Sequence, residues 1–137
     1  MKRVTHQIGE VADAVGLSLR TIRYYEEVGL VPPTGRTAGG FRLYTDDDIE
    51  RLRLVKQMKP LDFSLEEMRD LLGVRDRLSD GVAGEVHDEL VGRLAMYAAA
   101  AHARCETLRS QLESAEAITA TLRREVSRSR RSSGSRR

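Results

Sequence analysis

Residues 18–33 have the sequence SLRTIRYYEEVGLVPP, and this stretch decides the predicted fold. Ser18 is suited to cap a helix, because its hydroxyl can accept a hydrogen bond from a free backbone N–H of the first turn. Ile22 and Leu19 would form the inward face of that helix. Gly29 can end it in a left-handed conformation, and the two prolines that follow prevent it from continuing. We therefore predict a short helix with few inward residues and many charges at its surface.

A helix before this stretch and a hairpin after it complete the predicted unit. Gly16 would make a tight turn after four apolar residues that have the spacing of one helical face, namely Ile8, Val11, Ala12 and Val15. Residues 36–44, RTAGGFRLY, contain a Gly-Gly turn followed by side chains that alternate between apolar Phe41 and Leu43 and the more polar Arg42 and Tyr44. Alternation with a period of two is typical of strands, so these residues predict a small β-hairpin.

Two more helices are predicted from their start signals. Each start has the spacing of a capping box, in which two side chains satisfy free backbone N–H groups of the first turn, and the pairs are Thr45 with Asp48 and Ser64 with Glu67. The first of these helices would end at Pro60 and the second at Leu72. Three glycines within residues 73–84 then predict a polar connection.

Residues 85–126 contain no proline and a single glycine, which predicts one long helix. Its small and apolar residues recur at alternating intervals of three and four, with a weak step at Thr119. A narrow stripe kept up over about four heptads is more than a helix needs to cover its own domain, so we expect a homodimer. The residues predicted for this dimer contact are Leu94, Ala98, Ala101, Cys105, Leu108, Leu112, Ala115 and Leu122. The serine- and arginine-rich residues 127–137 predict a disordered basic tail.

The charges are unevenly distributed along the chain, although the whole carries a net charge of only +2. Residues 1–45 hold six basic and four acidic residues, residues 46–122 ten and sixteen, and residues 123–137 seven and one. A nucleic-acid contact would therefore have to use a local surface and the tail, because the molecule as a whole has no strong positive field.

Candidate DNA-contacting residues lie on the residue 18–27 helix and on the hairpin. A helix after a tight turn fits the major groove, where Arg can bind guanine with two hydrogen bonds and Thr or Tyr can reach phosphate or a thymine methyl group. A narrow ribbon beside it can follow the backbone or the minor groove. A single arginine is ordinarily a solvated charge, but two adjacent arginine-bearing elements favour DNA binding. The candidates are Ser18, Arg20, Thr21, Arg23, Tyr24, Tyr25, Arg36, Arg42, Tyr44 and Lys59.

The run IGEVADAVGLSLRTIRYYEEVGLVPPTGRTAGGFRLYTDDDIERLRLVKQM, followed by DFSLEEMRDLL, closely resembles the N-terminal domain of MerR-type regulators. The match covers residues 8–72, and IRYYEEVGLV and GGFRLYT are its specific segments. The resemblance implies a mainly α winged helix-turn-helix over residues 1–72 and dimerisation through an antiparallel coiled coil over residues 85–126. It also implies a regulator of bacterial type that bends and untwists an overlong promoter spacer so that RNA polymerase engages both promoter elements.

The resemblance also implies roles for individual residues. Arg20 and Arg23 correspond to recognition-helix contacts and Tyr25 to a contact with the DNA backbone. The hairpin contacts correspond to Arg36, Arg42 and Tyr44, and a basic position at the end of the third helix corresponds to Lys59. The sequence departs from the family at Phe41, where Tyr is usual, so a hydroxyl contact to phosphate is lost and the ring is expected only to pack. It departs again at Asp62, where Gly is common, but Asp tolerates a left-handed conformation.

The sequence predicts neither a cofactor nor a metal site. Cys105 is the single cysteine, which excludes an intrachain disulfide and a multi-cysteine metal site within one subunit. His102 and Cys105 share one helical turn and could form a site across a dimer with His87, but a small buried cysteine is the more usual role on an apolar stripe. The alanines around Tyr97 could leave a small pocket, although alanine in a seam more often lets two helices approach closely.

Three classes of function were compared. A promoter-distorting regulator is favoured, and a promoter-occluding repressor or an architectural, excisionase-like DNA binder is the alternative. An enzyme is not expected, because the sequence has no catalytic triad, phosphate loop or zinc motif. At 137 residues a second sizeable ligand-binding domain is not expected either. No apolar run approaches the roughly 20 residues of a membrane span, so we expect a soluble, cytoplasmic and nucleoid-associated protein.

Overall fold

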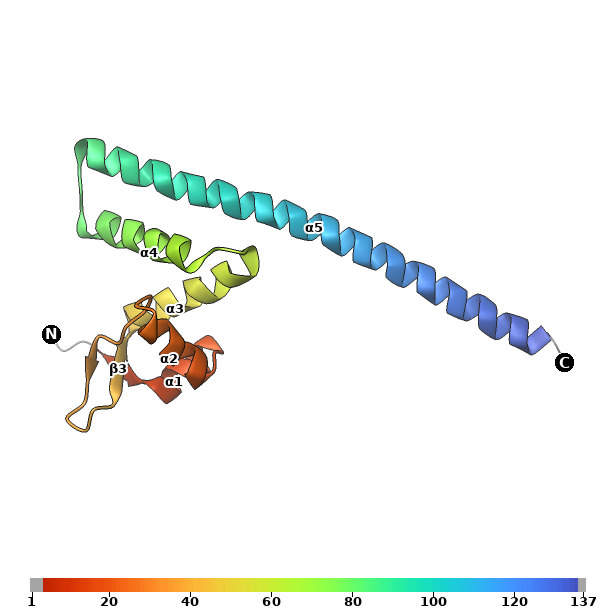
Figure 1. The fold of residues 1–137 in the computed structure, drawn as a ribbon, viewed down its shortest axis with the longest axis horizontal. Coiled ribbons are helices and arrows are strands. Elements are labelled where there is room, and N and C mark those ends of the chain that lie inside the picture. The colour runs from red at the N-terminus through yellow and green to blue at the C-terminus, as the bar shows by residue number, and fades with distance from the viewer. Residues whose placement is uncertain (1–3, 136–137) are drawn as a thin grey trace. The chain divides into compact units, whose positions relative to one another are not determined.

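The structure is a computed structural model that describes residues 4–135. Its elements, in chain order, are β1 (Thr5–Gln7), α1 (Ile8–Val15), α2 (Leu19–Glu27), β2 (Gly35–Arg36), β3 (Arg42–Thr45), α3 (Asp46–Met58), the 3-10 turn η1 (Lys59–Leu61), α4 (Leu65–Asp80) and α5 (Gly84–Ser135) (Figure 1). The chain forms two units, one up to Tyr97 and one from Ala98, and the second consists of the C-terminal part of α5. The fold is mainly helical with a small sheet, as predicted.

The predicted helix starts are confirmed. The Ser18 hydroxyl accepts a hydrogen bond from the Thr21 backbone N–H at 3.1 Å, which caps α2. Both capping boxes are complete: Thr45 with Asp48 begins α3, and Ser64 with Glu67 begins α4. These signals were predictable because a cap depends only on residues three positions apart.

The sheet has three antiparallel strands in the order β1-β3-β2. The predicted hairpin is present as β2 and β3, with Arg36 opposite Arg42. Strand β1 was not predicted, because its three residues are too few to show an alternating pattern. It pairs with β3 from Thr5 opposite Thr45, so β3 is the central strand and is held on both sides.

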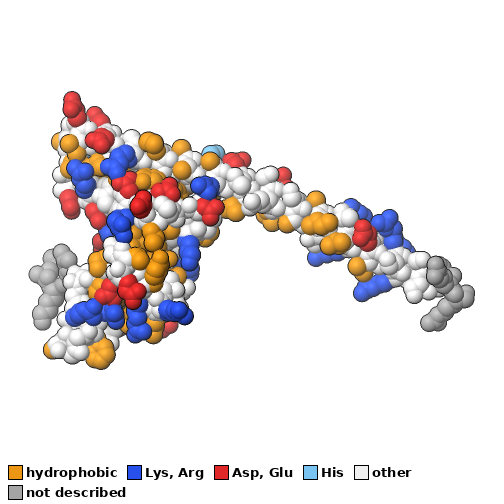
Figure 2. All heavy atoms as spheres, viewed as in Figure 1, with side chains coloured by type: hydrophobic (Ala, Val, Ile, Leu, Met, Phe, Trp, Pro, Cys, Tyr) orange, Lys and Arg blue, Asp and Glu red, His pale blue; other side chains and the backbone are white. Residues whose placement is uncertain are grey.

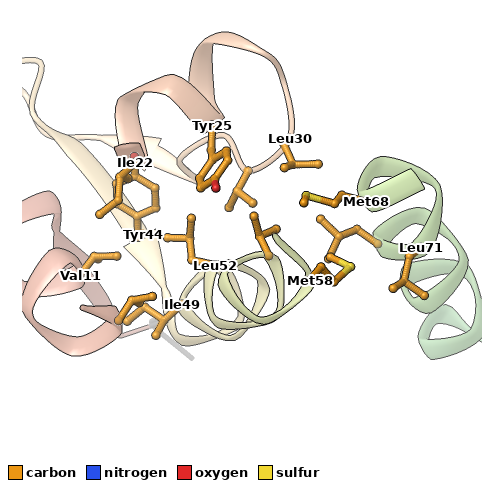
Figure 3. Close-up of a cluster of buried hydrophobic side chains, with 14 residues drawn as sticks. Val11, Ile22, Tyr25, Leu30, Tyr44, Ile49, Leu52, Met58, Met68 and Leu71 are labelled. Carbon is orange, nitrogen blue, oxygen red and sulfur yellow. The ribbon is translucent and has the colours of Figure 1, made fainter. Parts of the chain in front are cut away.

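The core of the first unit lies between α1, α2, β3, α3 and α4 (Figure 3). Ile22 and Tyr25 project from α2 into this core, three residues apart on one helical face. The prediction that Leu19 belongs to that inward face is wrong, because its side chain is 41% exposed. The inward face of α2 is therefore narrow, and most of the helix surface is free to meet a partner.

Helices α4 and α5 are both longer than predicted. Helix α4 passes through Gly73 and ends at Asp80, so only residues 81–83 of the predicted connection lie outside a helix. A glycine inside a helix costs about 1 kcal/mol relative to alanine, and the buried packing of the neighbouring Leu72 and Val74 offsets that cost. Helix α5 continues to Ser135, which differs from the predicted disordered tail over residues 127–135. Once a helix is nucleated, proline-free residues extend it at little cost. Residues 136–137 lie outside the described part of the chain.

The start of α5 is fixed to α4 by an ionic and an apolar contact. Asp70 of α4 accepts hydrogen bonds from Arg93 and from the Tyr97 hydroxyl, the latter at 2.5 Å. Leu90 is fully buried, and the Tyr97 ring meets Phe63 edge-on with centroids 6.1 Å apart. Tyr97 is thus engaged in packing and in a hydrogen bond to α4. Within residues 4–135, no helix has both the length and the apolar composition that crossing a membrane requires.

Candidate nucleic-acid interface

The outward face of α2 presents two arginines that have no partner among the described residues. Arg20 and Arg23 are both exposed, and neither forms a hydrogen bond or ion pair within residues 4–135. Tyr24 lies beside them and is 45% exposed. Because Ile22 and Tyr25 face the core, helical geometry directs these three side chains to the opposite side. The predicted recognition residues Arg20, Arg23 and Tyr24 are therefore accessible on one surface.

The two ends of α2 are held in place by hydrogen bonds from other elements. Arg69 of α4 donates to the Val28 carbonyl at 2.5 Å, just past the C-terminus of α2. Before its N-terminus, Gly16 has a φ of 74° and makes the turn from α1. Lys56 of α3 donates to the Val15 carbonyl at 2.8 Å, and a Cβ on Gly16 would lie 2.8 Å from the same Nζ atom. A side chain at position 16 would disturb this contact, so the angle between α1 and α2 depends on glycine there.

A single carboxylate at the end of α2 holds both hairpin arginines. Glu26 forms ion pairs with Arg36 at 2.7 Å and with Arg42 at a shorter distance, one arginine on each carboxylate oxygen. The hydrogen bond to Glu26 raises the pKa of the Arg42 guanidinium. Figure 2 shows basic side chains gathered on the surface around α2 and the hairpin, with acidic side chains among them. The hairpin arginines therefore position the hairpin against α2, and their charge is partly neutralised.

The sequence analysis assigned no role to Glu26. The signal was present, because IRYYEE places a carboxylate at the end of α2 and two arginines follow in the hairpin. Nothing in the sequence gives the spatial pairing, since 10 and 16 residues separate the partners.

Two predicted contact residues are buried instead. Tyr44 is 0% exposed and packs in the core, and its hydroxyl has no hydrogen-bond partner. Tyr25 is 3% exposed, and burial raises the pKa of both phenols. The prediction that their side chains contact DNA is contradicted by this burial, because a phosphate could reach them only if the core opened. Both tyrosines instead support α2 and β3 from beneath.

The other predicted contacts divide between capping and exposed positions. The Ser18 hydroxyl is engaged with the Thr21 backbone and also with the Thr21 hydroxyl at 2.8 Å, so both side chains serve the helix cap. Lys59 is exposed in η1, as a phosphate contact requires. Phe41 lies between β2 and β3 and is 66% exposed, so the expectation that its ring only packs is wrong. Asp62 has a φ of 61°, which confirms the expected left-handed turn.

A histidine links the sheet to two helices at the edge of this unit. His6 of β1 hydrogen-bonds to Asp46 at 2.7 Å and to Glu10 at 3.3 Å. These hydrogen bonds raise the pKa of His6, that to Asp46 most strongly. The contact joins β1 to the start of α3 and to α1.

The candidate sensor residues lie apart from any metal cluster. Residues 4–135 contain no group of three or more His, Cys, Asp or Glu side chains that could hold a metal ion. The Cys105 thiol is free and half-buried, while His102 lies 4.0 Å from Glu106 on its own helix.

Comparison with known proteins gives a consistent family. Two family models match: "MerR HTH family regulatory protein" over residues 7–73 and "MerR, DNA binding" over residues 49–124. The mercuric resistance operon regulatory protein of Bacillus cereus is 48% identical over 71 residues, which cover 52% of this chain and 54% of that protein. The chain thus spans about half the length of the curated relatives it matches.

Solved structures share the fold. A putative MerR family regulator from Listeria monocytogenes has 26% identity and a TM-score of 0.62, covering 79% of this chain and 78% of that one. HiNmlR, a MerR family regulator lacking the sensor domain and bound to promoter DNA, has a TM-score of 0.64 at 24% identity, covering 80% and 76%. The matched families are regulatory proteins and not enzymes, as expected. Because the second family model covers more than half of its residues, this chain belongs to the MerR family of helix-turn-helix regulatory proteins.

Proposed function

We propose that this protein is a transcriptional regulator that binds promoter DNA sequence-specifically as a homodimer, with α2 in the major groove. The observation that carries the proposal is the exposed, unpartnered pair Arg20 and Arg23 on a helix whose opposite side is anchored in the core. Guanine offers two acceptors in the major groove, and a free guanidinium can bind both. Elsewhere in this unit, most arginines near α2 are already bound to a carboxylate or a carbonyl.

The hairpin acts as the wing beside the recognition helix. Arg36 is the more exposed of its two arginines, so it can reach a phosphate while Arg42 keeps the contact to Glu26. Phe41 places an exposed ring at the tip of the hairpin, where it can lie against sugars or the floor of the minor groove. Lys59 would add a further phosphate contact from η1.

The homodimer would form through α5. Leu108, Leu112 and Leu122 are 45%, 57% and 52% exposed in a single chain, although they belong to one heptad stripe. Leaving several leucines in water is costly, at about 25 cal/mol for each Å² of apolar surface that a partner could cover. A second α5 supplies a matching stripe, with residues 1–72 of each chain as the DNA-binding domain and α5 as the dimerisation helix.

The proposed output is activation by distortion of the promoter. Two α2 helices fixed to one dimer would bend and untwist the DNA between their half-sites, so that RNA polymerase can engage both promoter elements. The alternatives are a repressor that occludes the promoter and an architectural DNA binder.

In vitro transcription from two promoters that differ only in spacer length separates these outputs. An untwisting activator stimulates transcription from the overlong spacer and loses its effect when the spacer is shortened. A repressor lowers transcription from both templates, and an architectural binder changes neither. The same templates, footprinted with hydroxyl radicals, report whether the protein occupies the spacer at all.

A further inference from the structure

Four arginines form a basic patch near the C-terminal end of α5. Arg123, Arg124, Arg128 and Arg131 line one shallow hollow around Ser127, because steps of three to five residues return to the same side of a helix. All four are exposed, and none has a carboxylate partner among the described residues. Figure 2 shows the corresponding concentration of basic side chains on the C-terminal part of α5. We refer to these four residues as the basic end.

An acidic patch lies around the turn between α4 and α5. Asp80, Glu85, Asp88 and Glu89 are exposed, and the single recorded partner of any of them is the neighbouring His87, 3.3 Å from Asp88. We refer to these four residues as the acidic end. Within its own chain, each end thus has four charges that no opposite charge of the described residues balances, apart from that histidine.

We propose that the basic end binds the acidic end of the partner subunit, so that each homodimer is closed by two identical charge contacts. This inference rests on the proposed homodimer and adds to it the residues that fix its orientation. A parallel pair of α5 helices would set basic end against basic end and acidic end against acidic end. An antiparallel pair sets opposite charges together, so the charges favour the antiparallel pair and oppose the parallel one.

The apolar stripe gives a register that agrees with this contact. In an antiparallel coiled coil, an a position faces a d position of the partner. Pairing Cys105 with Leu108 of the partner subunit, and Val91 with Leu122 of the partner subunit, keeps that rule along the whole stripe. It places residues 123–131 across from residues 82–90 of the partner.

The weak position of the stripe supports the same register. Thr119 then faces Leu94 of the partner subunit, and Leu94 is already packed against the core of its own first unit. A polar residue therefore stands where the partner offers little free apolar surface.

Charge-reversal variants of the full chain test the contact. One variant changes all four arginines of the basic end to Glu, a second changes all four carboxylates of the acidic end to Lys, and a third carries both sets. Each is studied by sedimentation equilibrium at low and high salt, with circular dichroism to confirm helix content. Each single set should weaken the wild-type dimer by about tenfold or more, since attraction becomes repulsion at both contacts. The third variant should recover the wild-type dissociation constant, because all charges are again opposite.

Mixing the first and second variants should give a heterodimer that is more stable than either homodimer. The wild-type dimer should also weaken as salt rises, because these contacts are exposed. A single-set variant with an unchanged dissociation constant would overturn the inference while leaving the homodimer intact. If that variant instead lost only DNA affinity, the basic end would be a phosphate contact and the inference would again fail. A wild-type chain that is monomeric in every condition would refute the homodimer itself.

Discussion

The contact between Glu26 and the two hairpin arginines gives a prediction that follows from the geometry alone. Glu26→Gln keeps the size of the side chain but removes the charge that binds Arg36 and Arg42. Glu26 is only 18% exposed, while its partners are 47% and 28% exposed, so both ion pairs are partly screened by water. Partly exposed pairs contribute up to about 1 kcal/mol each, so we expect a loss of about 1–2 kcal/mol in the free energy of unfolding.

The same change should alter DNA binding in two opposite ways. Freeing two arginines and removing one negative charge should strengthen binding to random DNA and steepen its salt dependence, because more counterions are released. The hairpin would no longer be held against α2, so affinity for the preferred site should not rise in step. The ratio of specific to non-specific affinity should therefore fall.

Fluorescence anisotropy with a site selected from random DNA, and with its scrambled version, measures both affinities at several salt concentrations. Glu27→Gln is the matched control, because it removes the same charge from the next residue, which is exposed and has no ion pair within residues 4–135. If Glu26→Gln and Glu27→Gln shifted the two affinities equally, the contact would not position the hairpin and the reasoning would be refuted.

Three further predictions concern the dimer, the sheet and the cysteine. Changing Leu108 and Leu112 together to Lys should give monomers, because each truncated buried leucine already costs about 2–5 kcal/mol and charges in the seam cost more; full dimer at micromolar concentration in sedimentation would disprove the stripe. His6 has a raised pKa, so its contribution to stability is complete below its unfolded pKa and is lost as pH rises through the higher folded value. Urea unfolding should therefore show that wild type loses stability relative to His6→Gln between acidic and mildly alkaline pH, and a constant difference would contradict this. Cys105→Ser should leave promoter binding and transcription unchanged with zinc, copper(I) or peroxide, whereas a response confined to wild type would make Cys105 a sensor.

The helix caps and the order of elements were predictable because their signals are local. Ser18, Thr45 and Ser64 each act on a backbone group three residues away, and no tertiary contact is needed to infer them. The long α5 stripe was predictable for the same reason, since its period is written in consecutive residues. Its end was not, because the composition of residues 127–135 suggested disorder while the helix already formed before them continued.

The hairpin shows where sequence patterns were insufficient. Alternation correctly placed Arg42 and Tyr44 on one face of β3, but it did not say which face meets the core. The structure turns this face toward α2, so Tyr44 is buried and Arg42 reaches Glu26 at the edge. The choice of face depends on strand β1 and on α2 together, and neither contact leaves a signal within the hairpin itself.

The central claim is that α2 recognises bases, and Arg20→Ala tests it most directly. The measurement is competition binding of the full chain to the selected site and to a set of variants with one base pair changed at a time, at matched salt. We predict a loss of about 1–3 kcal/mol and a relaxed preference at one symmetric pair of base positions, one in each half-site. Arg42→Ala serves as the comparison and should weaken binding to all of these DNAs together. A loss from Arg20→Ala that is equal for every sequence would contradict base recognition by α2.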